Sequence, residues 1–426
     1  MNIFWFRRDL RTVDNTGLNK CLQQRKDVQP IFIFDTNIIS ELEVDDPRLT
    51  FIYENLKTIH QKLQSYNSSL KVYVGDPLKI FKEISNAHSI ESVYTNSDYE
   101  PYANTRDNAI LEILKDRKIE FKTFKDHVIF EKSEVVKNDG LAYTVFTPYK
   151  NKWLEKYQSL DNSIEENTQF KNLKLSNHIL PKIEDIGFKI SSIKVPIFNL
   201  NKAIDYEKTR NFPGLDSTSK IGPHLRFGTV SIRKIVRSVS NVNSTFLSEL
   251  IWREFFIQIL HHFPKVVSEN FKSKYNSIAW NNNEKDFENW CNGTTGYPIV
   301  DAGMNELNKT GFMHNRVRMI TASFLCKHLL IDWRWGEAYF AKKLLDYELA
   351  SNNGNWQWCA GTGCDAAPYF RIFNPYEQTK KFDKELTYIN KWVDNLNSFD
   401  YPTPIVDHKW ARNRALEAYK IGLAKL

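Results

Sequence analysis

The chain has 426 residues, which is too long for one ordinary hydrophobic core, so we expect two domains. Its formal net charge of +7 is modest for that length; it is compatible with a polyanionic partner but does not indicate one. No run of about twenty apolar residues occurs, which excludes a membrane-spanning helix. The five cysteines are scattered without a C-x-x-C pair, which excludes a disulfide framework and a zinc site, and we expect no bound metal.

The first part of the chain alternates short apolar runs with amphipathic stretches. Four runs have the length and composition of buried strands: NIFWF, PIFIFD, LKVYVGD and ESVYTN. Apolar residues at helical spacing predict helices over 46–63 and 103–119. This alternation predicts βαβ units and a parallel, Rossmann-like sheet. WFRRDLR follows the first strand in place of G-x-G-x-x-G, so the usual dinucleotide fingerprint is absent.

The remainder of the chain is first irregular and then helical. The irregular part is polar, apart from the short helical pattern FTPYKNKWLEKY. Beyond it, residues 246–263 are apolar nearly all round and predict a buried helix, and a helical pattern over 299–330 should break near Gly311. Residues 381–426 suggest a closing helical cap. We therefore expect an α/β domain at 1–130, an interdomain linker at 131–200 and a helical domain at 201–426.

The stretch from Asp346 to Pro375, DYELASNNGNWQWCAGTGCDAAPYFRIFNP, combines carboxylates, amides and tryptophans. Polar groups this dense between apolar helices need partners, because an unpaired buried amide or carboxylate is costly. A large polar ligand would supply those partners; the alternative is a loop packed on its own aromatic rings. Trp356 and Trp358 are two residues apart, so one can face the core while the other faces a cleft.

Three further clusters combine residue types that suit a binding site. Between Tyr206 and Arg226, hydroxyls and close backbone N–H groups at Thr218, Ser219 and Gly222 could cradle a phosphate, although a plain N-cap is the alternative. The other two clusters each occupy one helical face. Their members are Glu249, Trp252 and Arg253 in the first, and Asn315, Arg318 and Met319 in the second. The alternatives are an ion pair beside a packed Trp, and a solvated basic helix.

The stretch from Asp346 to Pro375 closely resembles the flavin-binding signature of the DNA photolyase and cryptochrome family. WFRRDLR and the FTPY-x-x-x-W pattern from Phe146 to Trp153 extend the resemblance over nearly the whole chain. The resemblance implies an α/β Rossmann-like domain that can hold an antenna chromophore, followed by a large all-α domain that binds FAD. Positions 315 and 319 lack the histidines of (6-4) photolyases, so the chain is most similar to class I photolyases of cyclobutane pyrimidine dimers.

The resemblance also assigns residues to the cofactor. The positions that match its FAD contacts are Tyr206, Thr218, Ser219, Lys220, Ile221, Gly222, Arg253, Asn315, Arg318, Asp346, Tyr347, Glu348 and Asn352. Arg318 should pair with Asp346, and Asn352 should lie beside flavin N5, where an amide suits the reduced anionic flavin that repair needs. Many relatives have Arg and Ser where this chain has Lys220 and Gly222, so a side-chain contact from position 222 is lost.

Two other groups of residues follow from the same resemblance. The match to the family's electron relay is Trp280, Trp333 and Trp356, with Trp356 nearest the flavin; residue spacing alone would make them core tryptophans, and Trp335 is an additional neighbour. The positions expected to contact the lesion or the flanking DNA are Arg210, Glu249, Trp252, Asn315, Arg316, Met319, Trp358 and Gln378. Glu249 and Asn352 are expected to take part in catalysis.

The function implied is light-driven repair, in which an electron passes from excited reduced FAD to a dimer flipped out of UV-damaged DNA. The alternatives are a cryptochrome-like blue-light receptor without repair, and a plain nucleic-acid-binding protein. Asn352 and the short tail favour a repair enzyme. We expect a cytoplasmic monomer that joins the nucleoid when bound to DNA, without an obligate protein partner. The sequence does not predict which antenna chromophore is bound, or whether one is, because Tyr102 and Ala103 lack the polar side chains that hold a folate antenna in some relatives.

Overall fold

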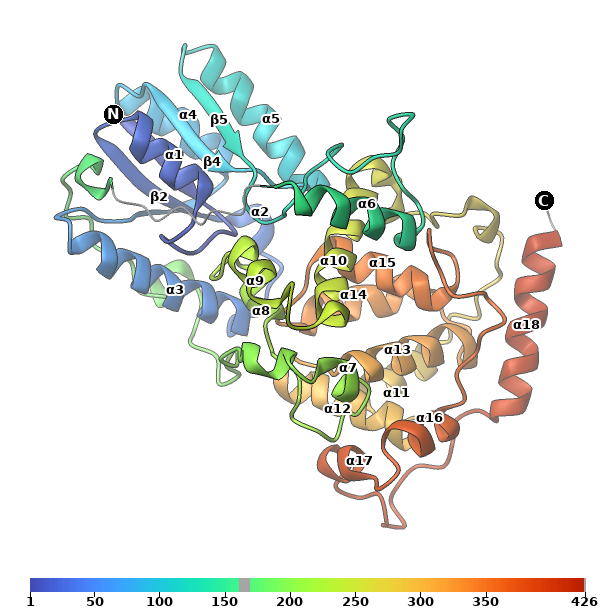
Figure 1. Ribbon diagram of the computed structural model, residues 1–426. Coiled ribbons are helices and arrows are strands. Elements are labelled where there is room, and N and C mark those ends of the chain that lie inside the picture. Colours follow the sequence, from blue (N-terminus) through green and yellow to red (C-terminus); the bar gives the residue numbers. More distant parts are fainter. Residues whose placement is uncertain (161–168, 425–426) are drawn as a thin grey trace. The chain divides into compact units, whose positions relative to one another are not determined.

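The computed structural model describes residues 1–160 and 169–424. The chain forms two compact units (Figure 1). The α/β unit consists of Met1–Val135, Trp153–Phe198 and Ile221–Asn241, and the helical unit of Val136–Lys152, Asn199–Lys220 and Val242–Leu426. Segments of the two units alternate along the chain. This division has no single pair of boundaries to compare with those expected at 130 and 200, which stay predictions.

The sheet of the α/β unit is fully parallel, and its strands run in the order β3-β2-β1-β4-β5. The strands are β1 (Asn2–Phe6), β2 (Val28–Asp35), β3 (Lys71–Gly75), β4 (Ser92–Asn96) and β5 (Glu120–Phe124). The predicted Rossmann-like sheet is therefore confirmed. The sequence did not indicate β5, because this edge strand, EFKTF, is only half buried and carries a weak apolar pattern.

Helices cover both faces of this sheet. Alternate residues of β1 point to opposite faces, so Phe4 and Phe6 join one core while Ile3 and Trp5 join the other. Helices α1 (Thr16–Gln24) and α3 (Pro47–Gln64) pack on the first core, and α4 (Pro77–Ala87) and α5 (Pro101–Lys115) on the second. A short helix, α2 (Thr36–Ile39), follows β2 directly.

Asp-Pro pairs fix the starts of two of these helices. The Asp46 carboxylate accepts a hydrogen bond from Arg48 N at 2.8 Å, and that of Asp76 accepts one from Leu78 N at 2.7 Å. In each case a proline occupies the first helical position, where its missing N–H costs nothing.

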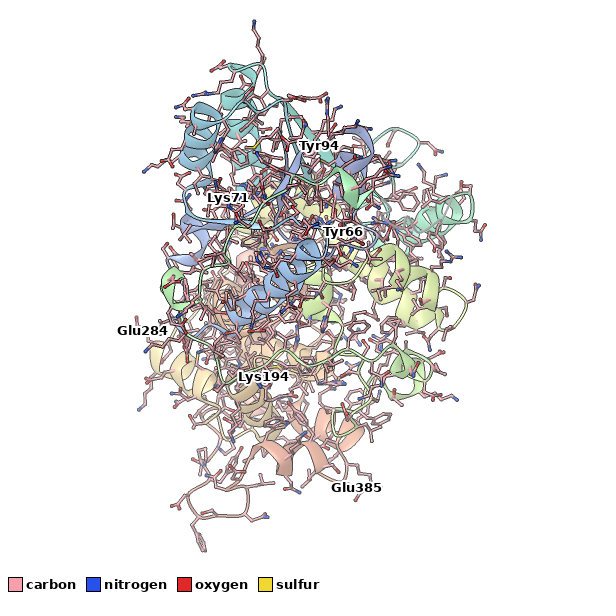
Figure 2. The ribbon with its side chains drawn as sticks, turned by 90° about the vertical axis from the view of Figure 1, so that its left-hand side faces the viewer. Tyr66, Lys71, Tyr94, Lys194, Glu284 and Glu385 are labelled. Carbon is pink, nitrogen blue, oxygen red and sulfur yellow. The ribbon has the colours of Figure 1, made fainter. Side chains whose placement is uncertain are left out.

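Later segments of the chain complete the α/β unit. Tyr66 lies two residues after the end of α3 (Figure 2). Its ring stacks on that of Phe170, with ring centroids 4.6 Å apart. Helices α8 (Gly222–Arg226) and α9 (Ile232–Val239) also belong to this unit. Asp126 accepts hydrogen bonds from Arg11 at 2.7 Å and from Arg233 at 3.0 Å. Burial raises the pKa of Asp126, but the two guanidinium groups together outweigh this effect. The pKa of Asp126 therefore lies below its usual range. Part of WFRRDLR is therefore structural.

The helical unit packs around one large apolar cluster. Its helices are α7 (Tyr206–Thr209), α10 (Ser244–His262), α11 (Glu284–Asn292), α12 (Pro298–Thr310), α13 (Asn315–Ser323), α14 (Trp333–Lys343), α15 (Leu349–Ala360), α16 (Pro375–Phe382), α17 (Thr387–Trp392) and α18 (His408–Ala424). Helix α6 (Phe146–Gln158) begins in this unit, and α10 is largely buried, as predicted. The predicted break is confirmed, because α12 ends at Thr310 and Gly311 follows with φ +67°. Over residues 1–160 and 169–424, no helix has the length and apolar character needed to cross a membrane.

Candidate functional site

Two neighbouring pockets lie in the helical unit. The inner pocket is lined by Asn315, Arg318, Met319, Ala322, Phe340, Leu344, Asp346, Tyr347, Glu348, Ser351, Asn352, Asn355, Trp356 and Cys359. The outer pocket is lined by Arg210, Glu249, Trp252, Arg253, Phe256, Asn315, Met319, Ser351, Asn355 and Trp358. Asn315, Met319, Ser351 and Asn355 line both, so molecules in the two pockets would contact the same side chains. Helix α15 also separates its tryptophans as expected: Trp356 is 2 % exposed, while Trp358 faces the outer pocket.

Ion pairs fix the polar rim of these pockets. Arg318 donates to both oxygens of Asp346 at 3.1 and 2.9 Å, and its Nε donates to Met313 O at 2.7 Å. The predicted Arg318–Asp346 pair is therefore confirmed, and its two-pronged geometry holds the carboxylate in one orientation.

Glu249 and Arg253, on the predicted face of α10, form ion pairs with residues of other segments. Arg253 donates to Glu348 at 2.8 Å, and Glu249 pairs with Arg210 at 2.6 Å. Burial raises the pKa of Glu249, and the Arg210 guanidinium offsets part of that rise. The sequence pattern suggested a Glu–Arg pair within the helix as the alternative to a cleft wall; the observed pairs instead connect α10 to α15 and to the segment that follows α7.

Asn352 is fixed by a residue that the sequence analysis did not identify. Its Nδ2 donates to Glu337 O at 3.1 Å and to Glu337 Oε1 at 2.8 Å. With Nδ2 bonded to Glu337, the amide of Asn352, which lines the inner pocket, has its acceptor Oδ1 to offer to a ligand. Burial raises the pKa of Glu337, and the hydrogen bond from Asn352 offsets part of that rise. Glu337 lies on α14 in WRWGEAYF, where no spacing relates it to DYELASNN, so only the tertiary structure identifies it.

Replacing Glu337 with Gln should remove part of the pH dependence of folding. Because the pKa of Glu337 is raised in the folded protein, its stabilising contribution is complete below the unfolded value of 4.5 and is lost as the pH rises through the folded pKa. Gln has a similar shape, keeps an acceptor for Asn352 and cannot ionise. Urea unfolding between about pH 5 and pH 8 should show the free energy of unfolding of wild type falling relative to Glu337→Gln. A constant difference between the two proteins would contradict this assignment.

The predicted relay tryptophans lie in or against the core of the helical unit. Trp333 and Trp356 are in the buried cluster, and Trp280 and Trp335 pack against it. Trp333 Nε1 donates to Asn270 Oδ1 at 2.9 Å. A Cβ at Gly336 would lie 2.1 Å from the Trp356 ring, so glycine is required for α14 to approach this indole.

Another tryptophan, Trp290, also contacts the predicted relay. Its ring centroid lies 6.1 Å from that of Trp356 in a T-shaped contact. The sequence analysis did not single out Trp290, because a lone tryptophan in a helical pattern is usually core. The relay order stays a prediction, since burial and ring contacts do not reveal which indole transfers an electron.

The predicted phosphate loop contains a buried hydroxyl and a constrained lysine. Ser217 Oγ is buried and has no hydrogen-bond partner among the described residues. Lys220 has φ +58°, and its Nζ lies 3.4 Å from the Phe312 ring centroid. Burial lowers the pKa of Lys220, an effect that a bound anion would oppose. Tyr206 contacts Phe246 edge-on at 5.1 Å. Thr218 and Ser219 lie in the same loop, while Ile221 and Gly222 belong to the α/β unit.

The predicted DNA residues include a group of arginines. Arg316 donates to Asn211 Oδ1 at 2.6 Å and lies 4.4 Å above the Phe382 ring. Burial lowers the pKa of Arg316, and the like charges of Arg210 and Arg371 lower it further. Positive charges this close together favour an anion nearby. Gln378, on α16, has a buried Oε1 without a partner among the residues that the structure describes.

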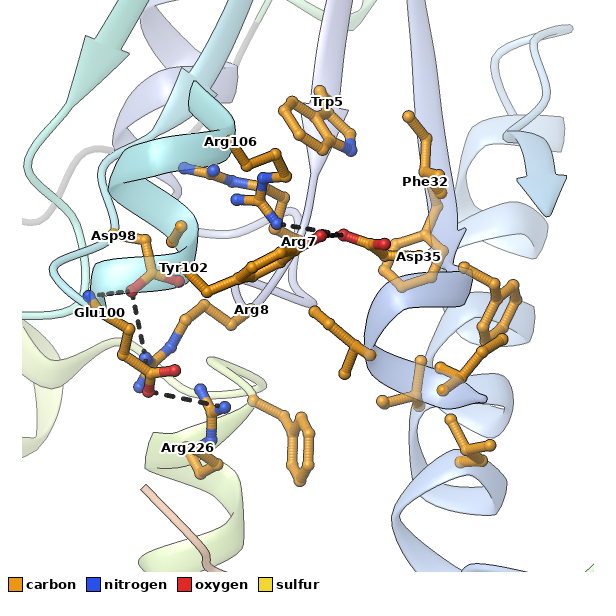
Figure 3. A pocket seen from close by; sticks show the side chains of 18 residues that line it. Trp5, Arg7, Arg8, Phe32, Asp35, Asp98, Glu100, Tyr102, Arg106 and Arg226 are labelled. Atoms are coloured by element: carbon orange, nitrogen blue, oxygen red, sulfur yellow. Dashed lines mark hydrogen bonds and ion pairs between the residues drawn. The ribbon is translucent and has the colours of Figure 1, made fainter. Parts of the chain in front are cut away.

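A third pocket lies in the α/β unit, at the carboxyl ends of the parallel strands, where open α/β sheets bind ligands. Trp5, Phe32 and Tyr102 are among the residues that line this crevice pocket (Figure 3). The guanidinium carbons of Arg7 and Arg106 each lie 4.9 Å from the centroid of the Trp5 ring. Tyr102 OH donates to Asp35 at 2.6 Å. Trp5 is 2 % exposed, and its Nε1 has no partner in the described structure.

Comparisons with known proteins agree with this geometry. Residues 2–169 match the family model of DNA photolyase, and residues 246–400 match that of the FAD binding domain of DNA photolyase. The chain is 33 % identical to the deoxyribodipyrimidine photo-lyase of Halobacterium salinarum, with 99 % of each chain covered. It is 34 % identical to the photolyase of Sulfolobus tokodaii, whose structure holds two FAD molecules with the implication of a novel light-harvesting cofactor (TM-score 0.87; 99 % and 100 % covered). Its likeness to the Synechocystis cryptochrome is weaker (26 % identity; TM-score 0.84; 98 % and 99 % covered).

These similarities define the chain as a flavoprotein of the photolyase type, with an FAD-binding domain in its helical part. The chain belongs to the DNA photolyase family. The expected fold class and family are thus confirmed, whereas the roles of individual site residues stay predictions.

Proposed function

We propose that the protein repairs cyclobutane pyrimidine dimers in DNA, using light as the energy source and FAD as its bound cofactor. It is then a carbon–carbon lyase. The observation that carries this proposal is the pair of pockets with common walls: a flat cofactor in the inner pocket and a flipped-out pyrimidine dimer in the outer pocket would both contact Asn315 and Met319.

The inner pocket suits an isoalloxazine ring. Phe340, Leu344 and Trp356 provide apolar surface, while Asn352 and the Arg318–Asp346 pair provide polar edges. Reduced FAD, when bound, supplies the electron for repair after it absorbs light. Asn352 Oδ1 is an acceptor and so fits an N–H donor, which flavin N5 carries only in the reduced forms. Ser217, Ser219 and Lys220 would hold the phosphates.

The outer pocket suits a flipped dimer. Trp252 and Trp358 provide stacking surfaces, and Met319 adds an adaptable apolar contact. Glu249, held by Arg210 at 2.6 Å, places a carboxylate at this pocket that could accept a hydrogen bond from the edge of a base. Enzymes that act on a base remove it from the duplex, which requires such a pocket beside a basic surface. Repair is favoured over a receptor function because the curated relatives are photo-lyases.

The crevice pocket is the proposed place of a second chromophore. Trp5 Nε1 is an unsatisfied donor, and the apolar residues Phe32, Ile38 and Leu49 line the same pocket (Figure 3). A planar heteroaromatic ring that accepts a hydrogen bond would satisfy both features. The position corresponds to a general ligand site of such sheets.

One preparation tests these proposals. Purified protein should be coloured, and denaturation should release FAD together with a second chromophore. Under blue light the protein should repair dimer-containing oligonucleotides. The same sample kept in the dark should leave the dimers intact. A colourless protein, or a flavoprotein without light-dependent repair, would contradict the proposed function. Release of one FAD per chain and no other chromophore, after expression in a host that makes the candidate chromophores, would contradict the second-chromophore proposal only.

DNA binding should depend on salt through individual arginines. Replacing Arg316 with Ala should reduce the slope of log affinity against log salt by about one phosphate contact. The matched control is Arg117→Ala, which removes an exposed arginine bonded to Asn86 in the α/β unit and should leave the slope unchanged. Filter binding over a salt series measures both slopes; equal slopes for wild type and Arg316→Ala would exclude Arg316 from the phosphate contacts.

The expected partners and location also stay proposals. We infer a monomer that binds UV-damaged DNA without an obligate protein partner, in the cytoplasm and at the nucleoid. Light scattering of the purified protein with and without DNA would test the monomer, and a stable dimer would contradict it.

A further inference from the structure

The FTPY segment at the start of α6 contacts a proposed lesion residue directly. Phe146 stacks on Trp252 with ring centroids 3.7 Å apart and an interplanar angle of 8°. The Phe146 side chain is 8 % exposed. In the sequence this segment carries part of the family resemblance and falls in the expected linker. No role in the cofactor or lesion site was assigned to it.

Three contacts fix the position of this phenyl ring. Phe146 N donates to Asp365 Oδ2 at 3.0 Å, which connects the first residue of α6 to the loop after α15. Gln258 Nε2, on α10, donates to Tyr143 O at 2.8 Å. Phe255, also on α10, contacts the edge of Phe146 at 5.8 Å. The ring is therefore held by the helix that carries Trp252 and by the loop that follows Trp358.

Phe146 covers one face of the Trp252 indole, and Trp252 also lines the outer pocket. Phe256, which also lines the outer pocket, contacts the same indole at 5.4 Å and 32°. A planar group in that pocket can therefore stack only on the indole surface that Phe146 and Phe256 leave free. Phe255 contacts the indole at right angles at 5.5 Å, which limits its rotation further. An indole free to rotate would lose conformational entropy when it stacks on a ligand; an indole already fixed does not.

We propose that Phe146 is a positioning residue for lesion recognition: it fixes the plane of Trp252, so that a flipped pyrimidine dimer meets a preformed stacking surface. This inference rests on the proposed function. Asp365 supports the same role by holding the backbone of Phe146. The FTPY segment then acts in substrate binding through Trp252 and does not touch the substrate itself.

A purely structural role predicts different behaviour. Loss of an ordinary core ring would lower the melting temperature and would affect flavin content, DNA binding and repair together. A positioning role predicts a selective effect, in which affinity for dimer-containing DNA falls while affinity for undamaged DNA and the repair rate at saturating dimer stay unchanged.

The test compares Phe146→Leu with a matched control. Tyr157→Leu removes another ring from α6, one that stacks on Trp153 at 4.9 Å and 18°. Phe146→Leu should raise the Kd for dimer-containing DNA about fivefold to tenfold, at the lower end of the range of one base–aromatic stacking contact. Tyr157→Leu should leave that Kd unchanged. Phe146→Tyr keeps the ring and should restore wild-type binding.

Variants of Asp365 provide a second measurement that leaves the ring in place. Asp365→Ala removes the acceptor for Phe146 N and should raise the same Kd by less than Phe146→Leu does; Asp365→Asn keeps an acceptor and should resemble wild type. Unchanged dimer affinity in Phe146→Leu would overturn the inference alone. So would an equal loss of affinity in Phe146→Leu and Tyr157→Leu. Equal affinity of the wild-type protein for damaged and undamaged DNA would instead overturn the proposed function, and this inference with it.

Discussion

Replacing Trp356 with Phe should stop the light-driven reduction of oxidised flavin while leaving repair intact once the flavin is reduced chemically. Trp356 lies four residues after Asn352 on α15, so both side chains are on the face of that helix that lines the inner pocket. Phe keeps an aromatic ring in a site that is 2 % exposed, but it is much harder to oxidise than indole. Loss of the oxidised-flavin absorption under blue light measures the first effect, and dimer repair after chemical reduction measures the second.

A neighbouring tryptophan provides the matched control. Trp290 is buried, contacts Trp356 at 6.1 Å and is not part of the predicted relay, so Trp290→Phe should photoreduce normally. If Trp356→Phe photoreduces at the wild-type rate, the electron takes another route, for example through Trp335. If Trp356→Phe loses repair even with chemically reduced flavin, Trp356 is part of the cofactor pocket and not only of the relay.

The outer-pocket tryptophans should show the opposite pattern. Trp252→Ala and Trp358→Ala should photoreduce normally but bind dimer-containing DNA more weakly, by about 1–3 kcal/mol for each lost stacking surface. The two assays on matched flavin content therefore separate residues that serve electron supply from residues that serve substrate binding. Composition and spacing cannot make this separation, because both groups are tryptophans in helices of one unit.

The sequence predicted the elements whose pattern is local. Strands buried on both faces appear as continuous apolar runs, and Asp-Pro pairs and Gly311 mark helix ends, so most of the architecture could be anticipated. The edge strand β5 could not, because half of it faces solvent. The resemblance to a family supplied the site residues, and the structure places many of them around the inner and outer pockets.

Contacts between distant residues could be predicted only where the resemblance implied them, as for Arg318 and Asp346. Glu337 bonds Asn352 across 15 positions, and Phe146 bonds Asp365 across 219. Neither separation corresponds to a helical or strand period, so no local pattern reveals the contact. Glu337 and Asp365 support the predicted site by orienting Asn352 and Phe146. Only the folded structure brings them close enough to be identified.

Replacing Arg318 with Met should weaken FAD binding strongly. The guanidinium makes two hydrogen bonds to Asp346 and one to Met313 O, so its removal leaves the Asp346 carboxylate unpaired at the edge of the inner pocket. Truncating one partner of a hydrogen-bonded charge pair costs about 2 kcal/mol or more, which corresponds to about thirtyfold weaker binding. Both side chains are partly exposed, so the lower end of that range applies. Flavin fluorescence during dialysis against a series of FAD concentrations measures the affinity.

Two further variants show whether this loss reflects the pair itself. Arg318→Met with Asp346→Asn removes both charges, and it should bind FAD more tightly than Arg318→Met alone, because no unpaired carboxylate remains. The matched control is Arg334→Met. Arg334 bonds both oxygens of Asp332 at 3.1 and 2.8 Å and one backbone oxygen, Ser268 O, at 2.9 Å, yet it does not line the inner pocket. Equal FAD loss in Arg334→Met would mean that the effect is general destabilisation. Wild-type affinity in Arg318→Met would mean that the isoalloxazine ring binds elsewhere, because a flavin in this pocket cannot be indifferent to an unpaired negative charge at its edge.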